Sequence, residues 1–141
     1  VALATHPSLA GRDIPFAYNR KEAKDHGEGG VLVGAPLKGR VVIIDDVITA
    51  GTSVKESVEI IEAAGATPCA VLIAMDRMER AGPDGALSPH SAVQEVQQRY
   101  GLPVVSIASL TDILDLLKNN QEFAQYQEAV LAYRTRYGVT G

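Results

Sequence analysis

Two adjacent carboxylates and a turn rich in hydroxyl groups lie within the segment from Val41 to Ser53. Asp45 and Asp46 follow an apolar run directly, and a Thr/Gly/Ser turn then leads into a segment with helical spacing. Backbone N–H groups and hydroxyls at a helix N-terminus form a ready site for a phosphate. The two acids are close enough to reach the hydroxyls of a sugar whose phosphate lies in the turn. The alternative from composition alone is a capped helix with both acids solvated.

A second candidate segment, from Asn19 to Gly30, carries four groups that can be positive. They are Arg20, Lys21, Lys24 and His26. Ala23 is the one apolar side chain of the segment, so we expect an exposed, mobile loop that can fold over an anion. The alternative is a solvated loop of mixed charge, because three acids balance the cations. These acids are Glu22, Asp25 and Glu28.

A third candidate is the pair Asp76-Arg77, which follows another apolar run. The guanidinium group of an arginine can hold a planar carboxylate through two parallel hydrogen bonds. The alternative is a surface arginine paired with Asp76 or Glu79, an arrangement that contributes little.

The elements that must position these residues alternate between strands and helices. Strands are expected at Ile14–Tyr18, Arg40–Ile44, Ala70–Met75 and Val104–Ala108. The runs at 40–44 and 70–75 are continuously apolar, which is typical of strands buried on both faces. Strands that alternate with helices predict right-handed crossovers and a mostly parallel sheet flanked by helices, an α/β fold. Ligands of such sheets bind beyond the carboxyl ends of the strands, here after Tyr18, Ile44 and Met75.

Helices are expected where apolar residues recur at helical spacing. The stripes are Val54/Val58/Ile61, then Ala92/Val93/Val96/Tyr100, then Ile113/Leu114/Leu116/Leu117, then Phe123/Tyr126/Val130/Tyr133. Ser53 and Glu56 have capping-box spacing at the start of the first, and Thr111 is expected to cap the third. Glycines 65, 101 and 138 stand where these helices should end. The Tyr126 and Tyr133 stripe is most simply explained by helix packing.

Composition limits the classes of protein that fit. The chain has 141 residues, a size usual for one domain, and its net charge of −4 argues against a general nucleic-acid binder. A single cysteine, Cys69, fits a reducing cytoplasmic compartment. No apolar run approaches the roughly 18 residues of a membrane span, so no membrane partner is expected. The histidine and cysteine spacing does not support a structural zinc site.

The segment Val41–Ser53 resembles the PRPP (phosphoribosyl pyrophosphate) motif of type I phosphoribosyltransferases residue for residue. Asn19–Gly30 is similar to the catalytic loop of bacterial orotate phosphoribosyltransferases, and the resemblance extends over essentially all 141 residues. It implies the type I phosphoribosyltransferase fold, with residues 1–141 forming one domain. Members of that family have a further N-terminal part, and Val1–Pro7 reads like the tail of a helix. We therefore expect a C-terminal two-thirds, incomplete at the N-terminus and not a competent enzyme alone.

The resemblance also implies an activity. It is the transfer of ribose-5-phosphate from PRPP to orotate, giving orotidine 5′-monophosphate and pyrophosphate in de novo pyrimidine (UMP) biosynthesis. Mg²⁺ would be held mainly by PRPP and water, with no direct protein ligand. The implied partner is a second copy, in a homodimer that shares the catalytic loop across its interface.

The same resemblance assigns roles to individual residues. Lys24, His26, Asp45 and Asp46 would be catalytic, and Thr49 and Arg77 would bind orotate. The implied PRPP-binding residues are Arg20, Lys21, Lys24, His26, Asp45, Asp46, Val47, Ile48, Thr49, Ala50, Gly51, Thr52 and Ser53.

Two other functions fit the same motifs. One is a phosphoribosyltransferase for another base, since Arg77 is the main residue here that would select the base. The other is a regulator that keeps the fold to sense PRPP and binds nucleic acid. The basic loop and the net charge of −4 argue against the regulator, so we expect no nucleic-acid partner.

Overall fold

The computed structural model describes residues 14–19, 32–82 and 88–139. It divides into two compact units, Val1–Leu37 and Lys38–Gly141. The first contains strands β1 (Ala17–Asn19) and β2 (Leu32–Gly34). The second contains β3 (Arg40–Asp45), α2 (Thr52–Ala63), β4 (Thr67–Asp76), α3 (Ala92–Tyr100), β5 (Val104–Ser109), α4 (Leu110–Asn119), the 3-10 helix η2 (Ala124–Tyr126) and α5 (Gln127–Tyr137).

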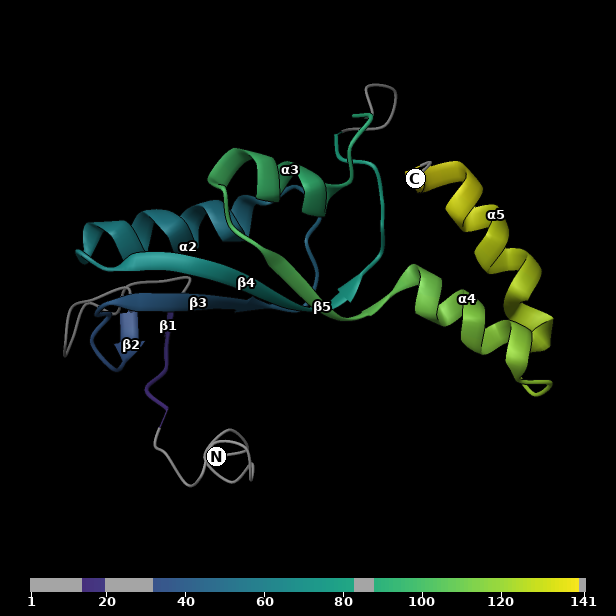
Figure 1. Ribbon diagram of the computed structural model, residues 1–141, viewed down its shortest axis with the longest axis horizontal. Helices are drawn as coiled ribbons and strands as arrows, with labels where there is room; N and C mark the ends of the chain where they lie inside the picture. The colour runs from purple at the N-terminus through teal and green to yellow at the C-terminus, as the bar shows by residue number, and fades with distance from the viewer. Residues whose placement is uncertain (1–13, 20–31, 83–87, 140–141) are drawn as a thin grey trace, which may run out of the picture. The chain divides into compact units, whose positions relative to one another are not determined.

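The sheet of the second unit has three parallel strands in the order β3-β4-β5 (Figure 1). Asp45 at the end of β3 pairs with Ile73 of β4, and Asp76 at the end of β4 pairs with Ser109 of β5. The carboxyl ends of all three strands therefore meet at one edge of the sheet. The predicted parallel α/β sheet is confirmed, and the structure extends each of its three strands by one to four residues.

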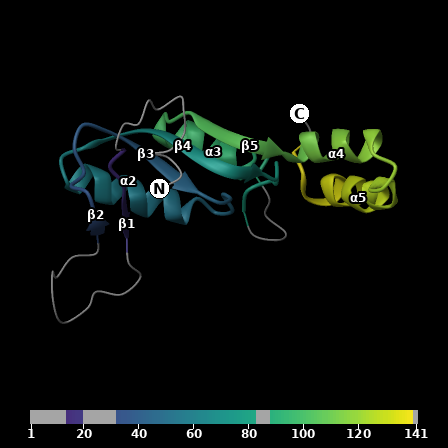
Figure 2. The same ribbon diagram turned by 90° about the horizontal axis from the view of Figure 1, so that it is seen from below.

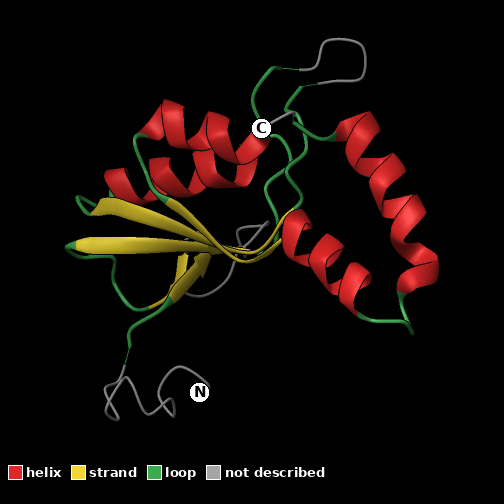
Figure 3. Ribbon diagram, turned by 45° about the vertical axis from the view of Figure 1, so that its right-hand side comes forward, coloured by secondary structure: helices red, strands yellow, loops and turns green. Residues whose placement is uncertain are grey.

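Helices α2 and α3 cover the same face of this sheet (Figure 3). The strands follow one another in chain order, so two crossovers of the same hand place both helices on one side. Each helix buries an apolar stripe against the sheet. The buried residues are Val54, Val58 and Ile61 of α2 and Ala92, Val93 and Val96 of α3. Both helical stripes were predicted correctly.

The opposite face of the sheet is apolar and exposed in the described part of the chain. Ile43, Val71 and Ile73 are buried beneath the helices, whereas the side chains that alternate with them are not. These exposed residues are Val42, Ile44, Leu72, Val105 and Ile107, with Ile44 69% and Ile107 89% exposed. The prediction that these strands are buried on both faces is wrong for the described residues, because both crossover helices lie on the same side.

We expect a purified polypeptide of these 141 residues to self-associate through the exposed face, because water is excluded when apolar surfaces meet. Ile44→Lys combined with Ile107→Lys should raise the dissociation constant at least about tenfold in analytical ultracentrifugation. Leu116→Lys changes an equally apolar, half-exposed residue on α4 and serves as the control. Equal association of all three proteins would show that this face is not the contact.

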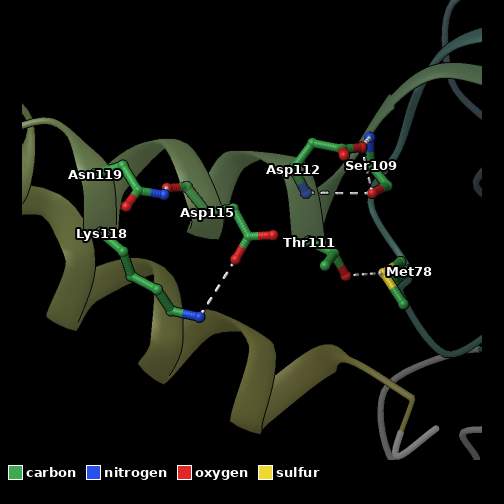
Figure 4. A network of polar contacts seen from close by, with 7 residues as sticks. All are labelled: Met78, Ser109, Thr111, Asp112, Asp115, Lys118 and Asn119. Atoms are coloured by element: carbon green, nitrogen blue, oxygen red, sulfur yellow. Dashed lines mark hydrogen bonds and ion pairs between the residues drawn. The ribbon is translucent and has the colours of Figure 1, made fainter.

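Helix α4 begins with a capping box formed by Ser109 and Asp112 (Figure 4). The Asp112 N–H donates to Ser109 Oγ at 3.3 Å, and Ser109 N–H donates to Asp112 Oδ2 at 2.7 Å. The predicted cap, Thr111, is therefore wrong by two residues. Thr111 instead directs its hydroxyl to the Met78 sulfur, 3.4 Å away, and so links α4 to the segment that follows β4.

The last predicted helix is divided into η2 and α5, which lie beside α4 (Figure 2). The predicted end at Gly138 is confirmed, since this residue is the C-cap of α5. No residue of α5 is buried, so the predicted packing stripe is not a core stripe.

In the first unit, β1 and β2 form an antiparallel pair in which Asn19 faces Leu32. The strand predicted at Ile14–Tyr18 is thus observed three residues later at its start and one later at its end, and its predicted place in the parallel sheet is wrong, because it pairs with β2 in a separate antiparallel sheet. Strand β2 was not predicted from the sequence. The two strands flank residues 20–31, which contain the basic segment and lie outside the described residues.

Candidate functional site

The acid pair and the arginine segment lie at the same edge of the sheet. The Asp46 carbonyl accepts hydrogen bonds from Ala74 N–H at 2.9 Å and Met75 N–H at 3.1 Å. This contact joins the end of β3 to the end of β4, which leads into Asp76 and Arg77. The Arg77 charge also acts on the Asp46 carboxylate. Both motifs therefore lie beyond the carboxyl ends of their strands, two of the three places that the sequence selected, and the structure brings them together.

The two acids are fixed by hydrogen bonds within their own turn. Asp45 Oδ1 accepts the Asp46 N–H at 2.9 Å, and Asp46 Oδ1 accepts the Val47 N–H at 2.7 Å. The Val47 N–H is the largest cause that lowers the pKa of Asp46 below its usual value, with smaller contributions from Asp45 and Arg77. These hydrogen bonds favour the ionised form of Asp46, whose exposed carboxylate can accept hydrogen bonds from ligand hydroxyls.

The turn after the acids is anchored by one buried residue and is otherwise open. Ile48 is buried, whereas Thr49 and Ala50 are exposed. Gly51 is the N-cap of α2 in the left-handed conformation, and no side chain of the described residues caps the helix there. The first N–H groups of a helix have no partner within it. This turn therefore presents free donors at a helix N-terminus, as an anion site requires.

Ser53 has a different role from the one predicted. It lies inside the first turn of α2, and its hydroxyl donates to Asp45 Oδ2 at 2.5 Å. The predicted capping box of Ser53 and Glu56 is therefore wrong, because the nearby carboxylate competes for the serine. The predicted C-terminal glycine of α2 is confirmed, since Gly65 has φ 74° and donates to the Glu62 carbonyl at 2.9 Å.

Gly51 is required by its backbone conformation and by its neighbour. Its φ is 70°, and a Cβ there would lie 3.1 Å from Val96 Cγ2 of α3. We expect Gly51→Ala to lower the free energy of unfolding by about 1–2 kcal/mol and to weaken the binding of inorganic phosphate. Gly65→Ala is the matched control, because Gly65 has φ 74° with nothing within 4 Å of its Cβ position. Denaturant titration should show that Gly51→Ala is destabilised at least as much as Gly65→Ala, because only Gly51 also has a close neighbour. Calorimetry should show weaker phosphate binding in Gly51→Ala alone. Equal phosphate binding by both variants would contradict the site.

Arg77 is held by an ion pair and keeps other donors unused. Its Nη2 lies 3.1 Å from Glu79 Oε2, so the Glu79 pairing considered from the sequence is present. Its buried Nε has no hydrogen-bond partner among the described residues. The next residue, Met78, has φ 53°, and its N–H donates to Asp76 Oδ1 at 2.8 Å. A non-glycine residue in this conformation is strained, which is common beside ligand sites.

The sequence did not reveal that α5 joins this segment. Tyr133 was assigned to helix packing, yet its hydroxyl donates to Glu79 Oε1 from 54 positions away in the chain. Arg80 N–H donates to the Tyr137 carbonyl at 2.8 Å, and Val139 N–H donates to the Met78 carbonyl at 3.0 Å. Hydrophobic periodicity shows which residues of one helix share a face, so it does not identify partners in another element.

The predicted loop residues Arg20, Lys21, Lys24 and His26 lie outside the described residues. Within residues 14–19, 32–82 and 88–139, no three or more His, Cys, Asp or Glu side chains are grouped to hold a metal ion. Among these residues, no helix has the length and apolarity needed to cross a membrane.

This fold and this site define a class of protein. Residues 2–98 match the family model described as "Phosphoribosyl transferase domain", and the chain belongs to the phosphoribosyltransferase family. It has the type I phosphoribosyltransferase fold, with its parallel sheet and flanking helices.

Several relatives within that family are named orotate phosphoribosyltransferase. The chain is 76% identical to an orotate phosphoribosyltransferase of Bordetella bronchiseptica and 77% identical to that of Bordetella petrii, each over 139 residues and 99% of this chain. A solved orotate phosphoribosyltransferase from Francisella tularensis superposes with a TM-score of 0.74 at 31% identity, over 97% of this chain and 61% of that one. The chain spans 62% of the length of the two Bordetella relatives.

Proposed function

We propose that the protein containing this chain transfers ribose-5-phosphate from PRPP to orotate, giving orotidine 5′-monophosphate and pyrophosphate in de novo pyrimidine biosynthesis. The observation that carries the proposal is the Asp45-to-Ser53 turn, which places two adjacent carboxyl groups beside a helix N-terminus without a side-chain cap. The high identity to proteins named orotate phosphoribosyltransferase supports orotate as the acceptor. Residues 1–141 are proposed to belong to one phosphoribosyltransferase domain.

The PRPP assignment divides the turn into two parts. The backbone N–H groups and hydroxyls of residues 49–53 bind the 5-phosphate, because the start of α2 offers donors without partners. Asp45 and Asp46 bind the ribose hydroxyls and place negative charge beside the anomeric carbon, which becomes cationic as pyrophosphate leaves. Val47 and Ile48 shape the connection between these parts. The phosphate contacts act as a remote handle that holds the reacting carbon in place.

Arg77, together with Thr49, is proposed to bind orotate. Arg77 directly follows β4, at the same sheet edge as the acid pair, and its side chain is 34% exposed and so open to a ligand. Hydrogen bonds from its guanidinium to the orotate carboxylate would separate this base from those that lack the group.

The residues at this site fit a magnesium ion that is held mainly by PRPP and water. Mg²⁺ prefers oxygen ligands and is usually bound through one or two carboxylates together with substrate phosphates. Asp45 and Asp46 would attract the ion by their negative charge without ligating it directly, and the lowered pKa of Asp46 favours its charged form. When bound, the ion would neutralise charge on the departing pyrophosphate.

The basic segment is proposed to complete the site. Arg20, Lys21, Lys24 and His26 stabilise the pyrophosphate charge and exclude water, which otherwise hydrolyses PRPP. In the proposed homodimer this segment serves the active site of the partner. A cytoplasmic location fits the substrates and the single cysteine.

Lys24→Ala is expected to lower kcat by about a hundredfold while PRPP affinity changes by less than about threefold, because a closing loop acts mainly in the transition state. The control is Lys38→Ala, which also removes a lysine charge from the first 40 residues but lies outside the basic segment. Steady-state kinetics and PRPP calorimetry separate the two effects. A loss of PRPP affinity as large as the loss of kcat would argue for simple electrostatic binding.

The proposed activity is tested with the complete protein that contains this chain. Pyrophosphate release should require PRPP and Mg²⁺ and should be fastest with orotate among orotate, uracil, hypoxanthine and adenine. Release with another base alone would assign a different phosphoribosyltransferase. PRPP binding without turnover of any base would point to a PRPP-sensing protein.

A further inference from the structure

We propose that Glu79 and Tyr133 are positioning residues that hold Arg77 in place for the carboxylate of the base. The inference rests on the proposed function and extends it, because it assigns α5 a part in base specificity. It concerns two residues that do not themselves contact the substrate.

The Glu79 carboxylate joins Arg77 to α5. One of its oxygens, Oε2, lies 3.1 Å from Arg77 Nη2, and the other, Oε1, accepts the Tyr133 hydroxyl. The side chains of Arg77 and Glu79 are 34% and 22% exposed, so the pair is better protected than an ordinary surface ion pair. Because each oxygen has its own partner, Glu79 cannot rotate without losing one of them, and the guanidinium is restrained with it.

Helix α5 is itself attached to the arginine segment at several points. Met78 and Arg80 form backbone hydrogen bonds with Val139 and Tyr137, and Arg80 Nη2 donates to the Arg136 carbonyl at 2.8 Å. The ring of Tyr133 also packs against that of Tyr137, with centroids 5.0 Å apart. Tyr133 therefore offers Glu79 a fixed hydroxyl, since the helix that carries it is bonded to both sides of Glu79.

Arg77 keeps donors available while one of its nitrogens is held. Nη2 is directed to Glu79, whereas the buried Nε has no partner among the described residues. The Arg77 side chain is 34% exposed, so its outer N–H groups remain open to an arriving carboxylate although Nε is buried. The restraint on Nη2 thus fixes the plane of the guanidinium, and its remaining N–H groups define the direction from which a carboxylate can bind.

A purely electrostatic role for Glu79 predicts the opposite effect. If Glu79 only neutralised Arg77, its removal would strengthen the attraction of Arg77 for an anionic base. If it positions Arg77, its removal weakens orotate binding despite the gain in positive charge. Glutamine distinguishes the two roles, because its carbonyl can still accept from Arg77 and its NH₂ group can donate to the Tyr133 oxygen.

The test uses the complete protein with four substitutions, together with Arg77→Ala as the reference. Glu79→Ala should raise KM for orotate about tenfold and Tyr133→Phe about threefold, with Glu79→Gln changed less than Glu79→Ala. KM for PRPP and Tm should stay close to those of the unaltered protein. Tyr137→Phe is the control, since it keeps the ring contact and the Tyr137 hydroxyl makes no hydrogen bond to the described residues. The ratio of kcat/KM for orotate to that for uracil should fall in parallel with each rise in KM.

The outcomes separate this inference from the function on which it rests. A lower or unchanged orotate KM in Glu79→Ala, with Arg77→Ala strongly impaired, overturns the positioning role and leaves the proposed function standing. Parallel rises in KM for orotate and PRPP, or a fall in Tm that accounts for them, assign Glu79 to stability and also overturn it. If Arg77→Ala binds orotate normally, both the inference and the proposed role of Arg77 are wrong.

Discussion

Replacing both acids at the end of β3, with Asp45→Asn and Asp46→Asn together, is expected to reduce turnover on the order of a hundredfold or more. Asparagine keeps the size of each side chain but removes the negative charge proposed to lie beside the cationic sugar. It also retains an oxygen that can accept the N–H groups of Asp46 and Val47, so the turn should keep its shape. Steady-state rates of pyrophosphate release give the effect.

Two further measurements make this result specific to the site. Circular dichroism and Tm should show that the double variant is folded. Asp115→Asn is the matched control, because Asp115 is a surface carboxylate of α4 paired with Lys118 at 3.3 Å. Near-normal turnover by the folded double variant would mean that Asp45 and Asp46 have been assigned the wrong role.

The second large effect is expected at Arg77. Arg77→Ala should raise KM for orotate by about 30- to 100-fold, since charge-assisted hydrogen bonds contribute about 1.5–3 kcal/mol each. KM for PRPP should change little, because of the two substrates only orotate carries the carboxylate in question. Arg77→Lys should recover little of the loss, because an ammonium group lacks the planar pair of donors.

Arg40→Ala provides the control for Arg77, because Arg40 is an exposed arginine at the opposite, amino end of β3. It should leave both KM values unchanged. A comparable rise in KM for PRPP and orotate in Arg77→Ala would indicate that the arginine supports the end of β4 instead of binding the base.

Local patterns predicted the elements that depend on local interactions. The stripe Val54/Val58/Ile61 and the glycine at position 65 located α2, because burial and helix termination are decided within a few residues. The acid pair and the arginine were also placed at one sheet edge correctly, since parallel strands bring their carboxyl ends together.

The errors arose where a more distant partner competed with a local one. Ser53 has the spacing of a helix cap, but its hydroxyl donates to Asp45, eight positions earlier. The turn between them brings the two side chains together. Thr111 is as good a capping residue as Ser109, yet β5 continues to Ser109 and the helix begins directly after it. Burial of β3 on both faces could not be judged either, because it depends on which side each crossover helix takes. Tyr133 and Glu79 are paired only through the docking of α5.

The hydrogen bond between Ser53 and Asp45 joins the two groups proposed to bind the phosphate and the ribose of PRPP. Without ligand, the group proposed to bind phosphate and the group proposed to bind ribose satisfy each other at 2.5 Å. A ligand that carries only the phosphate must break this bond and leave Asp45 without its partner, whereas the hydroxyls of a joined ribose can replace the Ser53 hydroxyl at Asp45. Ribose-5-phosphate satisfies both groups at once, so its binding free energy should be more favourable than the sum for phosphate and ribose measured separately. We therefore expect the turn to prefer a sugar that is covalently joined to a phosphate over a separate sugar and a separate phosphate.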